Sequence, residues 1–306
     1  MDFKQKDFLK KYHLSKDDIS KAQIDWNTLM EIYHDFNTYR TSYETQADFI
    51  ANTLRRHEKI HSVKSRVKDP DHLIEKIIRK TPNRKEKYGE NFQFSIDNYK
   101  EEITDLIGVR AIHIFKDDWE KIHNFISKTW KVIEITANVR EGDDTKRFEE
   151  LNIQIKSRKS GYRSVHYLIE FFPTNQKVIT EIQVRTIFEE GYGEIDHQLR
   201  YSHQEIPEVL ALNLLLLNRI VGSSDEMASF INLLNRNWTK MESEYERIID
   251  LKNKQINELK NNIEEKATIT SEDKEELIAR LNEITINDNI VGLMGNLIKT
   301  SNPRNK

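Results

Sequence analysis

The sequence predicts an α+β fold in which a mixed sheet of about five strands is flanked by helices. Between Ile103 and Ile187 the apolar segments are short and rich in β-branched residues, which is typical of strands. On both sides of this region the apolar residues recur every three or four positions, which is the helical period. The sheet is therefore expected in the middle of the chain, with helical additions at both ends.

The composition indicates a protein with a real core and no membrane span. The chain has 306 residues, 37% of them hydrophobic and 32% charged, with a net charge of −3, which fits one or two domains. It lacks cysteine, so disulfides and thiolate metal sites are excluded. It has no run of about 18 apolar residues, and its N-terminus is too charged for a signal peptide. We expect a cytoplasmic protein.

The first third of the chain is predicted to be helical. From 16 to 59 neither glycine nor proline interrupts the helical period, which indicates one long helix or two. A further helix should begin after Pro70 and continue through Ile78. Thr81, Pro82 and Asn83 are expected to end it.

The middle region should supply the strands and one helix between them. The helix is expected around 119–130. The expected strands are 106–115, 132–139, 151–155, 165–172 and 178–184.

The C-terminal third is expected to form long helices, because no proline occurs between Pro207 and Pro303. Apolar residues at alternating steps of four and three form a heptad seam of about three repeats. The seam consists of Met227, Ile231, Leu234, Trp238, Met241, Tyr245 and Ile248. Thr270 and Asp273 resemble a capping box that opens a last helix through Ile284. At this length, the seam fits an intramolecular hairpin and an oligomer interface equally well.

Two carboxylates are candidate metal ligands. Asp105 begins one expected strand, and Glu181 opens or lies within another. Carboxylates on neighbouring strands can hold Mg²⁺ together with substrate phosphates. Singly, each carboxylate fits a solvated strand end at least as well. Arg110 and Arg185, placed beside them, favour the phosphate interpretation.

Cations and one aromatic residue add to this picture. Lys and Arg exceed Asp and Glu by seven between Arg55 and Lys87, which fits either a solvated helix face or a phosphate cradle. Lys76 and Lys80 are four residues apart and should share a helix face. Tyr162 follows Gly161 in an expected tight turn, where its ring could stack on a base.

Taken together, these segments resemble the synthetase domain of RelA/SpoT-type alarmone synthetases. The resemblance covers about 64–201, nearly half of the chain, and rests on several motifs that occur in the family's order. They are Arg66-Val-Lys68 with Lys76, Asp105–Arg110, Ser160–His166, and Glu181–Thr186 followed by Asp196-His197 and Tyr201. The resemblance divides the chain into an N-terminal helical segment, a synthetase domain and a C-terminal helical region, which are 1–60, 61–205 and 206–306.

The resemblance implies a nucleotidyltransferase-like fold and a GTP pyrophosphokinase. Such an enzyme moves the β,γ-pyrophosphate of ATP to the 3′-hydroxyl of GDP or GTP and releases AMP. It further implies roles for ten residues. Asp105 and Glu181 would bind Mg²⁺ and be catalytic, with Glu181 a candidate to accept the hydroxyl proton; Arg66 and Arg110 would sandwich adenine; Lys68 and Lys76 would hold ATP phosphates; Tyr162 would stack on guanine; His166, Gln183 and Arg185 would line the acceptor side.

Two positions depart from the family pattern. His72 replaces a common serine in the ATP loop, and Glu190 replaces a common Asn or His. His34-Asp35 lacks the further His and Asp residues that a metal-dependent HD hydrolase needs, so no hydrolase domain is expected. The chain should thus resemble the small, single-domain synthetases.

Two other functions remain open from the sequence. Some single-domain relatives pyrophosphorylate the 3′-CCA end of tRNA, and neither the motifs nor the charge balance separates this acceptor from GDP or GTP. An inactive nucleotide-binding scaffold is the third reading. The presence of both Asp105 and Glu181 argues against it.

Overall fold

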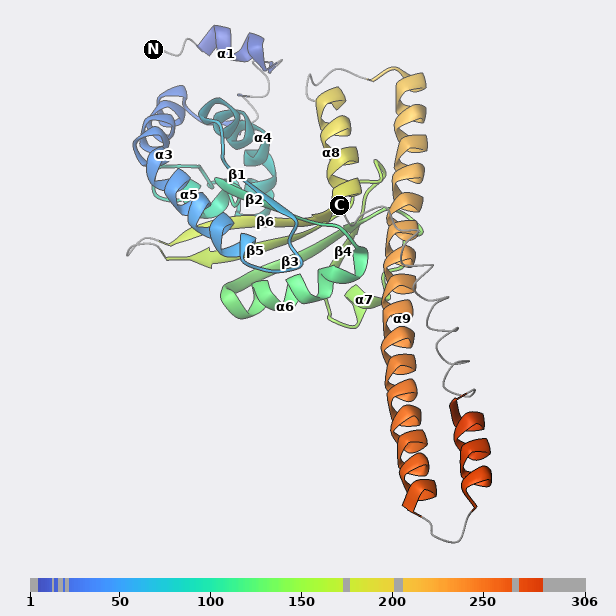
Figure 1. The fold of residues 1–306 in the computed structure, drawn as a ribbon. Helices are drawn as coiled ribbons and strands as arrows, with labels where there is room; N and C mark the ends of the chain where they lie inside the picture. Colours follow the sequence, from blue (N-terminus) through green and yellow to red (C-terminus); the bar gives the residue numbers. More distant parts are fainter. Residues whose placement is uncertain are drawn as a thin grey trace. The chain divides into compact units, whose positions relative to one another are not determined.

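The computed structural model describes residues 5–12, 14–15, 19, 22–172, 177–200, 206–265 and 270–282. The chain divides into two compact units, Met1–Phe230 and Ile231–Lys306. The first unit contains a mixed sheet with helices packed against it, which confirms the predicted fold class (Figure 1).

The sheet has six strands, one more than the sequence predicted. Their order across the sheet is β1-β2-β6-β5-β3-β4. The strands are β1 (Ser62–Val67), β2 (Ile107–His113), β3 (Lys131–Val139), β4 (Gln154–Ser157), β5 (Ser164–Phe171) and β6 (Val178–Thr186). The additional strand is β1, an edge strand with only partly buried or exposed residues, so it lacks the apolar pattern that identifies a strand in a sequence. β4 begins later than expected, because 151–152 form a turn.

Strand pairing assigns each residue to one face of the sheet. β2 runs parallel to β6, and β1 and β5 run antiparallel to these two central strands. Arg66 is paired with Gly108, and Gly108 with Glu181. Two residues further along the strands, and so on the same face, Arg110 is paired with Gln183, and Gln183 with His166. Paired residues point to the same side, so these polar residues share one face.

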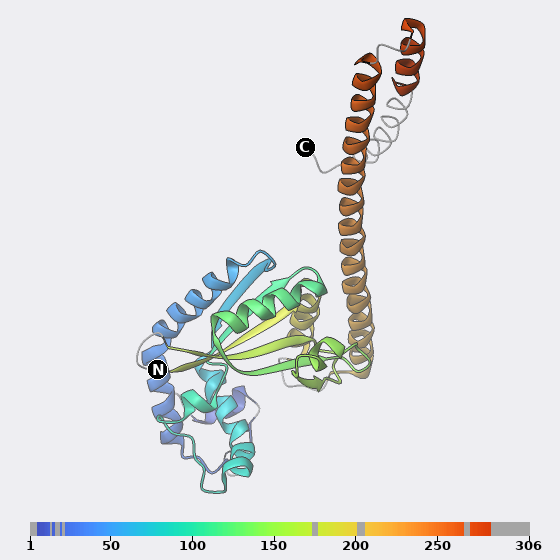
Figure 2. The same cartoon turned by 90° about the horizontal axis from the view of Figure 1, so that it is seen from below.

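The opposite face is apolar and carries the core. Val109, Val184 and Tyr167 belong to the buried cluster, together with Ile122 of α6 (Trp119–Thr129). The α3 helix (Trp26–Arg55) packs on the same face, where Asp48 accepts a hydrogen bond from Ser65 at 3.0 Å. Figure 2 shows α6 in front of the sheet with α3 beside it.

Two other helices flank the polar face. Figure 1 shows α4 (Pro70–Tyr88) and α8 (Ile187–Arg200) on the side of the sheet away from α6. Shorter elements complete this unit. They are α1 (Gln5–Lys11), α5 (Tyr99–Glu102), η1 (Lys116–Asp118) and α7 (Lys146–Glu149).

The expected end of α4 was wrong. The helix starts at an Asp69 cap but continues through Pro82 as far as Tyr88. Its buried stripe does not stop at Ile78 and extends to Thr81 and Lys85, so packing outweighs the backbone hydrogen bond that the proline removes.

The C-terminal region is helical, as predicted. α9 runs from Glu208 to Glu265. All seven seam residues are between 46% and 69% exposed, so the described residues do not bury the seam in a hairpin. Thr270 accepts a hydrogen bond from the backbone N–H of Asp273, as the predicted capping box requires, and a helix follows over 271–282. Ile284 lies outside the described residues.

No helix within the described residues is long and apolar enough to cross a membrane.

Candidate active site

Asp105 lies just before β2 and is held by two lysines. Its Oδ2 atom is 3.0 Å from the Lys68 Nζ atom and 2.6 Å from the Lys76 Nζ atom. Because Asp105 precedes the strand rather than lying in it, strand alternation does not separate it from Arg110. Burial opposes the charge on Asp105, but the two ammonium groups outweigh that effect and lower its pKa to about 2. Burial also lowers the pKa of Lys68, and the nearby Lys76 adds to this shift.

Glu181 lies inside β6 and is anchored by two neighbours. Its carboxylate receives contacts from His166 Nδ1 at 3.0 Å and from Gln183 Nε2 at 2.7 Å. Burial disfavours the charge, yet the hydrogen bond from His166, with a smaller contribution from Gln183, lowers the Glu181 pKa. The charge of Asp105 opposes this lowering, so the two carboxylates lie within electrostatic reach of each other.

A chain of polar contacts connects Glu181 to Tyr162. The Tyr162 hydroxyl oxygen is 3.1 Å from His166 Nε2 and accepts a hydrogen bond from Arg185 at 2.7 Å. The guanidinium carbon of Arg185 lies 5.1 Å from the centre of the Tyr162 ring. Arg185 also donates to Gln183 Oε1 at 2.5 Å. The predicted acceptor-side residues are therefore joined in one network.

This network depends on a close approach by α8. A Cβ atom on Gly193 would lie 2.7 Å from the Arg185 guanidinium. A side chain at this point of the helix would require the Arg185 guanidinium to shift.

Arg66 and Arg110 line a small cavity of about 100 Å³ together with Lys64, Glu194 and His197. The family resemblance implies that these two arginines bind adenine.

Glu190 connects Arg110, on the expected ATP side, with Arg185, on the expected acceptor side. Its carboxylate accepts a hydrogen bond from Arg110 at 3.0 Å and pairs with Arg185 at 3.1 Å. Arg110 also pairs with Glu194. The negative charge that departs from the family pattern at 190 is thus balanced by two arginines.

A cavity of about 590 Å³ contains both candidate metal ligands. Asp105 and Glu181 line it with Lys76 and His166, whereas Tyr162, Gln183 and Arg185 do not. Further cations around it are Lys80, Arg84, Lys87, Lys156 and Arg158. Burial, together with Lys76, lowers the pKa of Lys80. Lys156 and Arg158 were not singled out from the sequence, although they directly precede the Ser160–His166 motif.

The two carboxylates fit a magnesium ion. Asp105 Oδ1 is buried and has no hydrogen-bond partner among the described residues, so it can take a cation. Within the described ranges no group of three or more His, Asp or Glu residues could hold a metal. Two carboxylates completed by substrate phosphates are the arrangement that Mg²⁺ prefers.

Several residues from the sequence analysis lie elsewhere. Lys85 is buried and donates to Gln23 at 2.5 Å, so the cation excess of 55–87 is not one surface. The His72 ring packs against Tyr12 and does not line the Asp105 cavity. Asp35 accepts a hydrogen bond from Tyr99 at 2.6 Å and pairs with Lys100, which gives it a structural role. Tyr201 lies outside the described residues.

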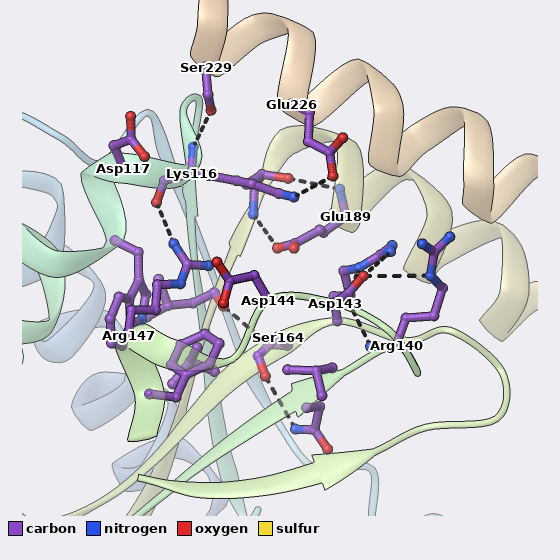
Figure 3. Close-up of a pocket in the computed structure, with 18 of the residues that line it drawn as sticks. Lys116, Asp117, Arg140, Asp143, Asp144, Arg147, Ser164, Glu189, Glu226 and Ser229 are labelled. Carbon is purple, nitrogen blue, oxygen red and sulfur yellow. Dashed lines mark hydrogen bonds and ion pairs between the residues drawn. The ribbon is translucent and has the colours of Figure 1, made fainter. Parts of the chain in front are cut away.

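Another cavity, of about 610 Å³, lies near the carboxyl ends of β2 and β6 (Figure 3). It is slightly larger than the Asp105 cavity but contains neither candidate metal ligand. Two of its cations, Arg140 and Arg163, are paired with Asp143. Because a site for phosphate transfer needs metal ligands beside its cations, the Asp105 cavity is the better candidate of the two.

Comparison with known proteins identifies relatives of the middle of the chain. Residues 65–206 match the family model described as a region found in RelA / SpoT proteins. This segment belongs to the RelA/SpoT family. Two relatives from Bacillus subtilis, GTP pyrophosphokinase YwaC and GTP pyrophosphokinase YjbM, are each 27% identical to this chain. The matches cover 63% of this chain in both cases, and 84% and 77% of the respective relatives.

The chain is also similar in fold to a solved structure. The crystal structure of small alarmone synthetase 1 from Bacillus subtilis matches with a TM-score of 0.51 and 23% identity. The match covers 66% of this chain and 97% of that one. It shows that the two chains share a fold.

The lowered pKa of Asp105 predicts a loss of stability in acid. The folded state keeps this carboxylate ionised down to about pH 2, whereas its ordinary pKa is 3.8. The Asp105 interactions stabilise the fold above pH 3.8, and this contribution of about 2 kcal/mol disappears as the pH falls to about 2. Urea unfolding across this range should show a smaller loss in Asp105→Asn than in the wild type. Identical pH dependence in both proteins would contradict the assignment.

Proposed function

We propose that this protein is an ATP:GTP/GDP 3′-pyrophosphotransferase that makes pppGpp or ppGpp and releases AMP. The observation that carries the proposal is the cavity in which Asp105 and Glu181 lie among lysines and arginines. Such a cavity offers metal ligands and cations to a triphosphate. The names of the two Bacillus subtilis relatives support the same activity.

The chain's residues divide the work between donor and acceptor. Arg66 and Arg110 hold adenine between them, and Lys68 and Lys76 bind the phosphates. Both lysines contact Asp105. The phosphates of a bound ATP would share the two ammonium groups with this carboxylate. Mg²⁺ held by Asp105 and Glu181 would neutralise phosphate charge when bound.

On the acceptor side, guanine stacks on the ring of Tyr162. His166, Gln183 and Arg185 orient the ribose and its phosphates. The 3′-oxygen attacks the β-phosphorus of ATP, the bond from that phosphorus to the α,β-bridging oxygen breaks, and AMP leaves. Glu181, kept ionised by its hydrogen bonds, accepts the hydroxyl proton. Positioning and charge neutralisation supply most of the rate.

We place the reaction in the cytoplasm. The domain boundaries that follow from the motifs are 61–205 for the synthetase domain and 206–306 for the helical region. We also propose that the exposed heptad seam of α9 pairs with a second copy of the chain, because its apolar residues are left in water.

The cations at the cavity rim also suit an RNA backbone, which keeps tRNA as the second candidate acceptor. Lys87 and Lys156 are among them. The two acceptors differ in the number of phosphates that they present, so the salt dependence of the activity separates them.

The carboxylates provide the first test. Asp105→Asn or Glu181→Gln should lower turnover by about a hundredfold or more, because each removes a principal charge at the reacting phosphates. The rate of AMP release from ATP with GDP or GTP measures this, and circular dichroism confirms folding. Asp144→Asn, outside the Asp105 cavity, is the matched control. Near-normal turnover in either carboxylate variant would exclude the assignment.

Tyr162 tests the acceptor. Tyr162→Ala should raise the KM for GDP or GTP by about tenfold or more, since a stacked base gains about 1 to 3 kcal/mol. Tyr162→Phe retains the ring and should be mild. For a tRNA acceptor, activity should instead fall steeply with salt. An acceptor KM that is the same in the Ala variant and the wild type would count against guanine stacking.

The seam gives a prediction about assembly. Leu234→Glu with Trp238→Glu places charges in the proposed helix pairing and should lower the particle mass in light scattering. Thr239→Glu with Ser243→Glu, exposed on α9 outside the seam, introduces the same two charges and is the matched control. An unchanged mass in the seam variant would exclude self-association through these residues.

A further inference from the structure

The turn that carries Tyr162 is held from behind by α9. Asn218 donates a hydrogen bond from Nδ2 to the Gly161 carbonyl oxygen at 2.8 Å. Its Oδ1 atom accepts one from Arg163 at 3.2 Å. Asn218 is only 1% exposed, so one buried amide binds the residues on both sides of Tyr162.

The Asn218 amide packs closely against the turn. Gly161 has a φ angle of +76°, which L side chains rarely adopt. A Cβ atom at that position would also lie within 2.6 Å of the Asn218 side chain. One turn further along α9, a Cβ atom on Gly222 would lie 3.2 Å from Arg163. The turn and the helix surface therefore determine each other's position.

Two further contacts connect the same face of α9 to the ends of β6 and η1. Asp225 accepts a hydrogen bond from the Thr186 hydroxyl at 2.8 Å, directly after Arg185 in the chain. Ser229 accepts one from the Lys116 backbone N–H at 3.1 Å (Figure 3). Asn218, Asp225 and Ser229 are seven and four residues apart and lie on one side of the helix. Asn218 is thus presented from a firmly placed element.

We propose that Asn218 is a positioning residue for the acceptor nucleotide, acting through the Tyr162 turn. This inference rests on the proposed function, in which guanine stacks on Tyr162. A buried amide with a purely structural role would stabilise the protein without favouring either substrate. An amide that sets the Tyr162 ring affects the acceptor and leaves ATP binding at Arg66 and Lys76 unchanged.

The main variant is Asn218→Asp. It keeps the side-chain size and the partner of Arg163, but replaces the donor with an oxygen that faces the Gly161 carbonyl. Asn213→Asp is the matched control, because Asn213 lies exposed on the same helix and donates to the Val209 carbonyl within α9. Asn218→Ser, which adds no charge, replaces the main variant if that one does not fold.

Steady-state kinetics should show a selective change. The KM for GDP or GTP should rise by about tenfold in Asn218→Asp, the scale of a lost buried hydrogen bond, while the KM for ATP stays within about twofold of the wild type. In a Tyr162→Ala background the same change should add little, because both substitutions act on one contact. Equal effects on both substrates, or full additivity with Tyr162→Ala, would overturn the inference.

Hydrogen exchange provides a readout that needs no activity. The peptide spanning 158–164 should exchange faster in Asn218→Asp than in Asn213→Asp, because the turn loses its support. Equal exchange in the two variants would show that Asn218 does not hold the turn and would overturn the inference. A wild-type protein that transfers nothing to guanine nucleotides would disprove the proposed function, while the exchange result would still report on the turn.

Discussion

The parallel pairing of β2 with β6 is the constraint on which the site depends. It sets Gly108 beside Glu181 and Arg110 beside Gln183. A shift of one residue would turn Glu181 into the apolar core, where a buried carboxylate without these partners is costly. The core side of the same strands, with Val109 and Val184 fully packed, therefore fixes the position of the polar side. Packing on one face thus determines chemistry on the other.

Two carboxylates of the site are each paired with two cations. Asp105 is paired with Lys68 and Lys76, and Glu190 with Arg110 and Arg185. Pairing reduces the cost of burying these groups. It also keeps the side chains in place, so that phosphates exchange partners with lysines that are already oriented. Preorganisation of this kind suits a reaction in which the protein contributes mainly position and charge.

The sequence predicted features that depend on nearby residues. The helix over 119–130, the cap at Thr270 and the strand that contains Glu181 all follow from local periodicity and spacing. Features that depend on distant contacts were missed. β1 is recognisable as a strand only through its pairing with β2, and α4 continues past Pro82 because its later residues are buried. Similarly, Asn218 meets Gly161 across 57 residues of sequence, and no local pattern marks such a contact.

The central claim is that this site transfers pyrophosphate from ATP to the 3′-hydroxyl of a guanine nucleotide. The most direct measurement incubates the purified chain with Mg²⁺ and γ-labelled ATP, and with GDP, GTP or tRNA in separate reactions. The account predicts that label appears in a 3′-pyrophosphorylated guanine nucleotide with equimolar release of AMP. Label found only in tRNA, or no labelled product with any acceptor, would contradict it.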